Sequence, residues 1–126
     1  MNKFLAALLI LVLLFAGSLL NGRYIDALTS RLIARTDAVC ALTASGETAA
    51  AVATAKEAEA LWKKADVYTS VFVRHAEADA VSDALADLRT ALYSGDAAAV
   101  RGEAEKLRDH LREIARMEHI TFGTVF

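Results

Sequence analysis

The sequence predicts an all-α fold, with an N-terminal transmembrane helix followed by a small three- or four-helix antiparallel bundle. Three observations support this prediction. A run of 17 uncharged residues lies near the start of the 126-residue chain, proline is absent, and the remainder is rich in Ala, Leu, Glu, Lys and Arg. These residue types are the strongest helix formers. The length beyond the run suits one small domain.

The uncharged stretch FLAALLILVLLFAGSLL (residues 4–20), here called the apolar run, directly follows Lys3. At about 1.5 Å per residue, it is just long enough to cross the hydrocarbon core of a bilayer. Because it exceeds the ~7–15 residues of a signal-peptide core, we interpret residues 1–22 as an uncleaved anchor that contacts membrane lipid through residues 4–20. The alternative is a signal peptide cleaved beside the small residues Ala16 and Ser18.

The charges that flank the apolar run favour opposite topologies. Lys3 and the amino terminus form a short positive tail, as in a signal anchor that translocates the rest of the chain. Arg23, Arg31 and Arg35 follow the run closely, and the positive-inside rule would keep them in the cytoplasm. We expect a single-pass protein of the cell membrane whose helical domain lies outside the cytoplasm.

Residues 23–119 form the predicted helical bundle. Two glycines, Gly46 in TASGET and Gly95 in LYSGDA, stand where a helix would end in a left-handed residue. Thr48 and Asp96 follow them closely, and such residues can cap the next helix. The sequence therefore predicts helix-to-helix turns at these two places.

The first and last helices of the bundle carry apolar stripes at heptad-like spacing. The first helix should run from the membrane to about Ala44, with the stripe Ile25, Leu28, Leu32, Val39 and Leu42, and Arg35 falls on the same stripe. The stripe of the last helix is Val100, Ala104, Leu107, Leu111 and Ile114. Its other face carries the i,i+3 pairs Glu103–Lys106, Glu105–Arg108, Asp109–Arg112 and Glu113–Arg116, which we expect to be solvated.

Residues 47–94 carry two stripes that are out of phase with each other. The first is Val52, Ala55, Trp62, Ala65 and Thr69, and the second is Ala78, Val81, Leu85, Leu88 and Leu92. One long helix could present the two stripes to different neighbours. Alternatively, the chain bends at residues 67–73, where β-branched and aromatic residues weaken helix propensity. We favour the bend, which gives a four-helix bundle with Trp62 in its core.

The chain closes on an apolar tail, residues 120–126, which contains Ile120, Phe122, Val125 and Phe126. We expect this tail to fold back onto the domain, and the alternative is a docking peptide.

The polar candidates are few. In VRHAEADAV (residues 73–81), His75 and Asp79 share one helix face. They supply two metal ligands at most, whereas catalytic zinc takes three from the protein, so we expect a histidine beside the packed seam. Arg35 should either reach water with its stem packed, or meet a carboxylate inside the bundle. The single Cys40 should be a buried thiol, and the alternative is an intermolecular crosslink.

No pattern in the sequence predicts a catalytic, cofactor-binding or metal site. The formal net charge of −2 gives no basic field for nucleic acid. We therefore expect a protein without enzymatic activity or cofactor, a scaffold or adaptor at the cell envelope that docks on a protein partner. One alternative is an extracytoplasmic ligand- or pH-sensing module that uses Arg35 and His75. Another is a metal-dependent enzyme that uses His75 and Asp79.

The stretch LWKKADVYTSVFVRHAEADAVSDALADLRTAL and the closing TFGTVF, behind the N-terminal apolar run, resemble the bacterial family known as domain of unknown function 4363. That family's pattern has a Trp before a His-x-Glu-x-Asp segment, then a Leu-rich helix, an acidic turn, another helix and an Asn-Ile-Phe-like ending. The matching positions here are Trp62, His75, Glu77, Asp79, Leu85, Leu88, Asp96 and Phe126, whereas Thr124 stands where the family has Asn. The resemblance implies a small membrane-anchored helical protein and implies no activity.

Overall fold

The computed structural model describes the backbone of residues 2–66, 69 and 73–125, and it describes their side chains as far as residue 117. The described residues form the helices α1 (Asn2–Ala44), α2 (Thr48–Lys64), α4 (His75–Ser94) and α5 (Ala97–Val125). The predicted all-α class is therefore confirmed for this part of the chain.

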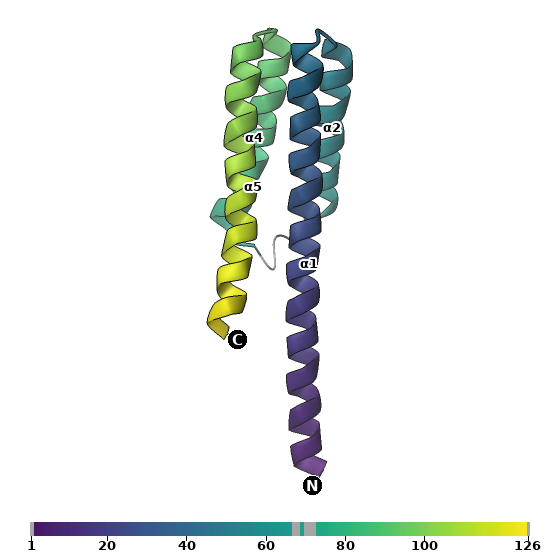
Figure 1. Ribbon diagram of the computed structural model, residues 1–126, viewed down its shortest axis with the longest axis vertical. Coiled ribbons are helices and arrows are strands. Elements are labelled where there is room, and N and C mark those ends of the chain that lie inside the picture. The colour runs from purple at the N-terminus through teal and green to yellow at the C-terminus, as the bar shows by residue number, and fades with distance from the viewer. Residues whose placement is uncertain (1, 67–68, 70–72, 126) are drawn as a thin grey trace.

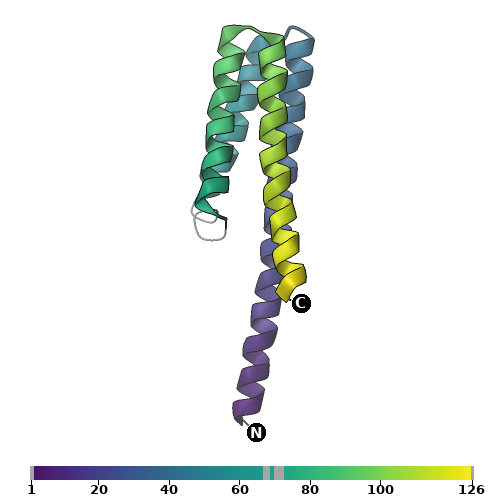
Figure 2. The same ribbon diagram turned by 90° about the vertical axis from the view of Figure 1, so that its left-hand side faces the viewer.

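The helices form a ring around one core. α1 packs against α2 and α5, and α4 packs against the same two helices, so α1 and α4 occupy diagonal corners. The turns that join α1 to α2 and α4 to α5 lie at the same end of the molecule (Figure 1). At the other end, the first half of α1 projects alone beyond the bundle, as a second view confirms (Figure 2).

Both predicted glycine turns are present. Gly46 has φ 81° and Gly95 has φ 75°, and both values lie in the left-handed region that favours glycine. After α1, the N–H of Glu47 donates to the carbonyl of Leu42 at 2.9 Å and the N–H of Gly46 donates to that of Thr43 at 3.1 Å. This pair of bonds is the Schellman motif, which satisfies carbonyls at a helix end.

The two helix starts behind these turns differ. Asp96 caps α5, because its Oδ1 accepts hydrogen bonds from the N–H groups of Ala98 at 3.0 Å and Ala99 at 3.3 Å. The expectation that Thr48 caps α2 is wrong. Thr48 is the first residue of the helix itself, and the capping position is held by Glu47, whose side chain makes no capping bond.

Among the described residues, the middle of the chain forms α2 and α4 as separate helices, as the bend predicted. α2 ends at Lys64 and α4 begins at His75, which allows each helix to turn its own stripe toward the common core. Most of the expected bend, at residues 67, 68 and 70–72, lies outside the described residues.

The core consists mainly of residues that the stripes predicted. Buried apolar residues of the described chain are Ile25, Leu28, Leu32, Val39, Ala51, Ala55, Ala58, Trp62, Ala65, Val81, Ala84, Leu85, Leu88, Ala91, Leu92, Val100, Ala104, Leu107, Leu111 and Ile114. The whole predicted stripe of α5 is buried. Leu42, Val52 and Ala78 are half-buried and pack against this core from its edge.

The buried stripe of α1 differs from the prediction at one position. Arg35 is exposed, and Thr36 takes the core position with 1% of its surface accessible. Thr29 and Thr36 are both buried, and each donates its hydroxyl to the carbonyl four residues earlier, that of Ile25 at 2.9 Å and that of Leu32 at 2.8 Å. A hydroxyl satisfied within its own helix costs little to bury.

α5 is longer than the sequence boundaries suggested. It continues as a helix to Val125, so residues 120–125 are its last turns, and residue 126 lies outside the described residues. α1 is likewise continuous from Asn2 through the apolar run to Ala44. The segment interpreted as an anchor and the first helix of the bundle are therefore one helix.

Candidate functional site

The first half of α1 exposes a large apolar surface. Phe4 is 72% exposed, Leu14 66% and Leu20 67%, whereas Ile25, the fifth residue after Leu20, is 1% exposed. The most apolar 18-residue window of α1 has a mean hydropathy of 2.5, and none of this window is buried. α1 is thus long and apolar enough to cross a membrane, which is consistent with a signal anchor or a signal sequence.

Ion pairs connect neighbouring helices around the bundle. Arg35 of α1 pairs with Glu57 of α2 at 2.9 Å, and Arg89 of α4 pairs with Glu59 of α2 at 2.8 Å. Both members of the Arg35–Glu57 pair are more than half exposed. Arg35 therefore has a partner carboxylate, but on the surface and not inside the bundle.

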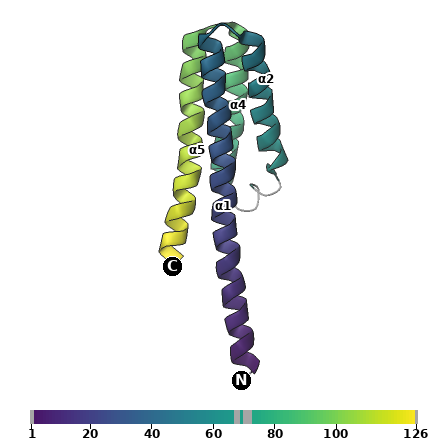
Figure 3. The same cartoon turned by 45° about the vertical axis from the view of Figure 1, so that its right-hand side comes forward.

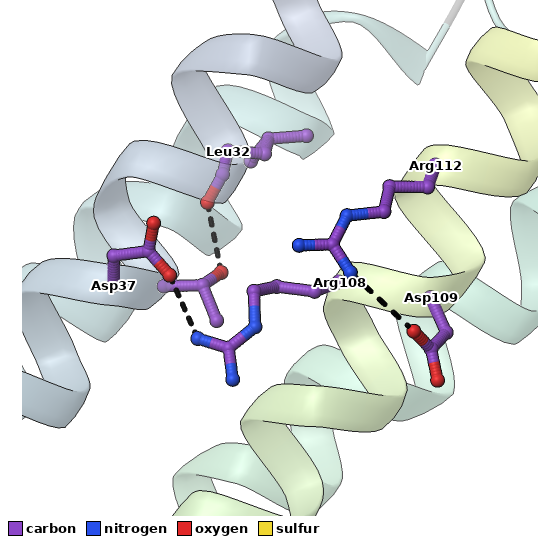
Figure 4. Close-up of polar contacts among 6 residues, drawn as sticks. Leu32, Asp37, Arg108, Asp109 and Arg112 are labelled. Carbon is purple, nitrogen blue, oxygen red and sulfur yellow. Dashed lines mark hydrogen bonds and ion pairs between the residues drawn. The ribbon is translucent and has the colours of Figure 1, made fainter.

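A third pair joins α1 to α5 and corrects one predicted contact. Arg108 was expected to pair with Glu105 along its own helix, but it reaches across to Asp37 of α1 at 2.7 Å, as Figure 4 shows. The hydrogen bond with Asp37 raises the pKa of the Arg108 guanidinium, partial burial opposes this, and the nearby Cys40 adds to the rise. Cys40 is a half-buried free thiol, less buried than expected.

The other three predicted pairs on α5 are present. Lys106 lies 3.6 Å from Glu103, and Arg112 lies 3.7 Å from Asp109 (Figure 4). Arg116 donates from Nε to Glu113 at 3.0 Å, and this bond lowers the pKa of the Glu113 carboxyl. This face of α5 is solvated, and we assign it no binding role.

We expect the coupling free energy between Asp37 and Arg108 to be below about 1 kcal/mol, because solvent screens a partly exposed pair. A double-mutant cycle with Asp37→Asn and Arg108→Gln, followed by denaturant unfolding, measures this coupling. A coupling above about 3 kcal/mol would mean that the pair is desolvated in solution.

Trp62 lies at a shallow groove between α2 and α4. Its side chain is 6% exposed, and Nε1 donates to the hydroxyl of Ser82 at 3.0 Å. Ser82 in turn donates to the carbonyl of Ala78 at 3.1 Å. The groove has a volume of about 220 Å³, and the Glu59–Arg89 pair also lines it. Trp62 thus lies in the core as expected, and the role of Ser82 was not predicted.

His75 and Asp79 lie on the surface. His75 is the first residue of α4, and both side chains are exposed. Glu77, in the first turn of α4, is half-buried. Among the residues that the structure describes, no three His, Cys, Asp or Glu side chains gather closely enough to hold a metal ion. The polar residues that suggested a ligand- or pH-sensing interior, Arg35 and His75, are both outside the core.

We expect His75→Ala to change the free energy of unfolding by no more than about 0.5 kcal/mol, because exposed surface substitutions rarely do more. The measurement is a pair of thermal melts, for the parent chain and the variant, at pH 5 and at pH 8. A pH-dependent difference between the two chains would restore the pH-sensing hypothesis.

A second groove lies between α1 and α2, at the end of the bundle next to the apolar run. Its volume is about 390 Å³. Its apolar lining comes from Ala27, Leu28, Leu61 and Ala65, and the polar side chains that complete it are Tyr24, Arg31 and Lys64. Figure 3 shows the two helices side by side, with α2 ending beside the middle of α1. Sequence reasoning missed this groove because its residues come from two helices whose register was unknown.

Comparison with known proteins identifies a family and leaves its role open. No curated protein and no solved structure matches the chain. One family profile, described as "Domain of unknown function (DUF4363)", matches residues 19–125. The match begins at the end of the apolar run and covers the whole bundle, including Trp62 and the segment with His75 and Asp79. The chain therefore belongs to the DUF4363 family.

Proposed function

We propose that this protein is a membrane-anchored interaction module, in which α1 crosses the bilayer and holds a helical bundle against its surface. The observation that supports this proposal best is the exposure of the apolar run on a helix that continues without interruption into the bundle. Without a membrane, the exposed leucines of the apolar run would lie in water. Exposed apolar patches of this extent mark contacts with a membrane or with another protein.

A continuous α1 gives the module a defined geometry. The 17 residues of the run span ~26 Å at ~1.5 Å per residue, slightly less than a hydrocarbon core of ~30 Å. Such a short span draws its flanking residues toward the hydrocarbon boundary. Because α1 also forms one corner of the bundle, the bundle stands at a fixed height above the bilayer.

The end of α5 supports this placement. The ion pair between Asp37 of α1 and Arg108 of α5 shows that these two residues lie at the same height along the bundle axis. Val125 lies 17 residues beyond Arg108, and Leu20 lies 17 residues before Asp37. Two antiparallel helices with the same rise per residue therefore bring Val125 level with the end of the apolar run. We propose that the last turns of α5 meet the bilayer surface there.

The proposed role in protein interaction concerns the helical bundle, which the membrane anchor leaves exposed to the solvent. We propose that the bundle lies outside the cytoplasm and docks on a protein of the cell envelope, without catalysing a reaction. The end of the bundle furthest from the membrane, where Tyr93 is 64% exposed, is the surface that such a partner would reach first.

Three measurements on the full chain in bacterial cells test this proposal. Alkaline extraction should leave the protein in the membrane fraction, and its intact mass should be that of an uncleaved chain. A photo-crosslinking residue at Tyr93 should capture one protein partner, and the same residue at Leu14 should capture lipid. Release by alkali, a mass that lacks the apolar run, or capture of no protein from the bundle would contradict it.

A further inference from the structure

We propose that the groove between α1 and α2 binds the anionic headgroup of a membrane phospholipid, with Arg31 and Lys64 contacting its phosphate. This inference rests on the proposed anchoring of α1 in a bilayer. It adds to that anchor a specific site for one class of lipid.

The charges of the groove suit an anion. Arg31 and Lys64 are both exposed, and neither forms an ion pair with a carboxylate among the described residues. Within the described part of the chain, no acidic residue lines the groove. By contrast, Arg89 in the groove beside Trp62 is already paired with Glu59. A phosphate could therefore contact both cations without displacing an existing partner, and Arg and Lys are the usual phosphate-binding side chains.

The apolar lining suits a lipid better than a small ion. Leu28, Leu61 and Ala65 line the same groove as the two cations. A volume of about 390 Å³ falls within the ~300–1,000 Å³ of sites that hold organic ligands. A phospholipid presents a phosphate and apolar carbons within a few bonds of each other, as this lining requires.

The position of the groove selects a lipid over a soluble phosphate. Tyr24 lies four residues beyond Leu20, which is ~6 Å along the helix axis. The headgroup layer on each side of a bilayer is ~5–8 Å deep, so the lower end of the groove lies within it. Arg31 lies 11 residues beyond Leu20, ~16 Å along the helix axis. Its long side chain leans toward the N-terminus of α1, and so toward the bilayer, and has to extend downward to meet a phosphate at the outer edge of this layer.

The test is native mass spectrometry of the full chain released from vesicles of equal parts phosphatidylcholine and phosphatidylglycerol. We expect the protein to retain one phosphatidylglycerol in preference to phosphatidylcholine. The double variant Arg31→Gln/Lys64→Gln should lose about tenfold in this preference. The matched control Lys56→Gln/Arg101→Gln removes two exposed cations from outside the groove, and neither pairs with a carboxylate among the described residues. It should retain the preference.

A second variant and a second ligand make the outcome specific. Ala27 also lines the groove and is exposed, so Ala27→Trp should fill the groove and lose the preference with no change in charge. Glycerol phosphate, added to the full chain in detergent, should bind far more weakly than phosphatidylglycerol. Equal binding of glycerol phosphate would assign the site to a soluble anion and overturn the proposal.

Vesicle flotation separates this inference from the proposed function. If the full chain floats with vesicles but shows no lipid preference, or if the control double variant loses the preference equally, the groove is not a headgroup site and the anchor stands. If the full chain does not float, the anchor itself is wrong and the inference fails with it.

Discussion

Replacing Trp62 with alanine is expected to lower the free energy of unfolding of the bundle by about 3–5 kcal/mol. Trp62 is 6% exposed and belongs to the core that all four described helices share. Its removal leaves a cavity that small alanines on the same helix, such as Ala55 and Ala58, cannot fill. The measurement is urea unfolding of the full chain in a mild detergent, followed by far-ultraviolet circular dichroism.

Two further variants separate packing from hydrogen bonding at this position. Ser82→Ala removes the acceptor for the indole N–H, which lies 3.0 Å away, and the donor to the carbonyl of Ala78. It should cost about 1 kcal/mol. Trp62→Phe keeps most of the apolar volume and should fall between the two. If Trp62→Ala costs less than 1 kcal/mol, the side chain is not part of the core in solution.

Leu32→Ala is expected to destabilise the bundle by about 2–5 kcal/mol, whereas Leu14→Ala in the same helix should leave bundle stability unchanged. Leu32 has no accessible surface, and Leu14 is 66% exposed. The two substitutions delete the same atoms from α1, so they form a matched pair. The difference between their effects on the free energy of unfolding shows whether only the second half of α1 packs in the bundle.

The same unfolding experiment in detergent decides this prediction. Equal destabilisation by both substitutions would mean that the first half of α1 packs against the bundle, against the division seen in the structure. No effect from either would mean that α1 contributes little to the bundle.

The helices were predictable where a single physical rule decides the outcome. The stripe from Val100 to Ile114 is strictly periodic and interrupted by no polar residue, and every member is buried. Gly46 and Gly95 were identifiable because few other residues tolerate a left-handed conformation. The bend between α2 and α4 followed from a phase difference between two stripes, which one straight helix cannot bring to a single core.

The errors arose where side-chain chemistry or distant contacts decide. Heptad-like spacing placed Arg35 on the core stripe, but Thr36 holds the core position, because its hydroxyl is satisfied within the helix and only 1% of its surface is accessible. Arg108 was paired with its neighbour on α5, although its partner, Asp37, is 71 residues away in sequence. The groove with Arg31 and Lys64 depends on the register between α1 and α2, which periodicity alone does not define.

Cysteine accessibility along the chain tests most directly whether α1 spans a bilayer as one uncleaved helix. In a Cys40→Ser background, the substitutions Asn2→Cys, Leu14→Cys and Arg101→Cys each provide one thiol for a membrane-impermeant maleimide. We predict labelling at position 101 in spheroplasts, at position 2 only in inverted vesicles, and at position 14 only after detergent is added. Labelling at position 14 in intact membranes, or loss of position 2 from the mature chain, would contradict the account.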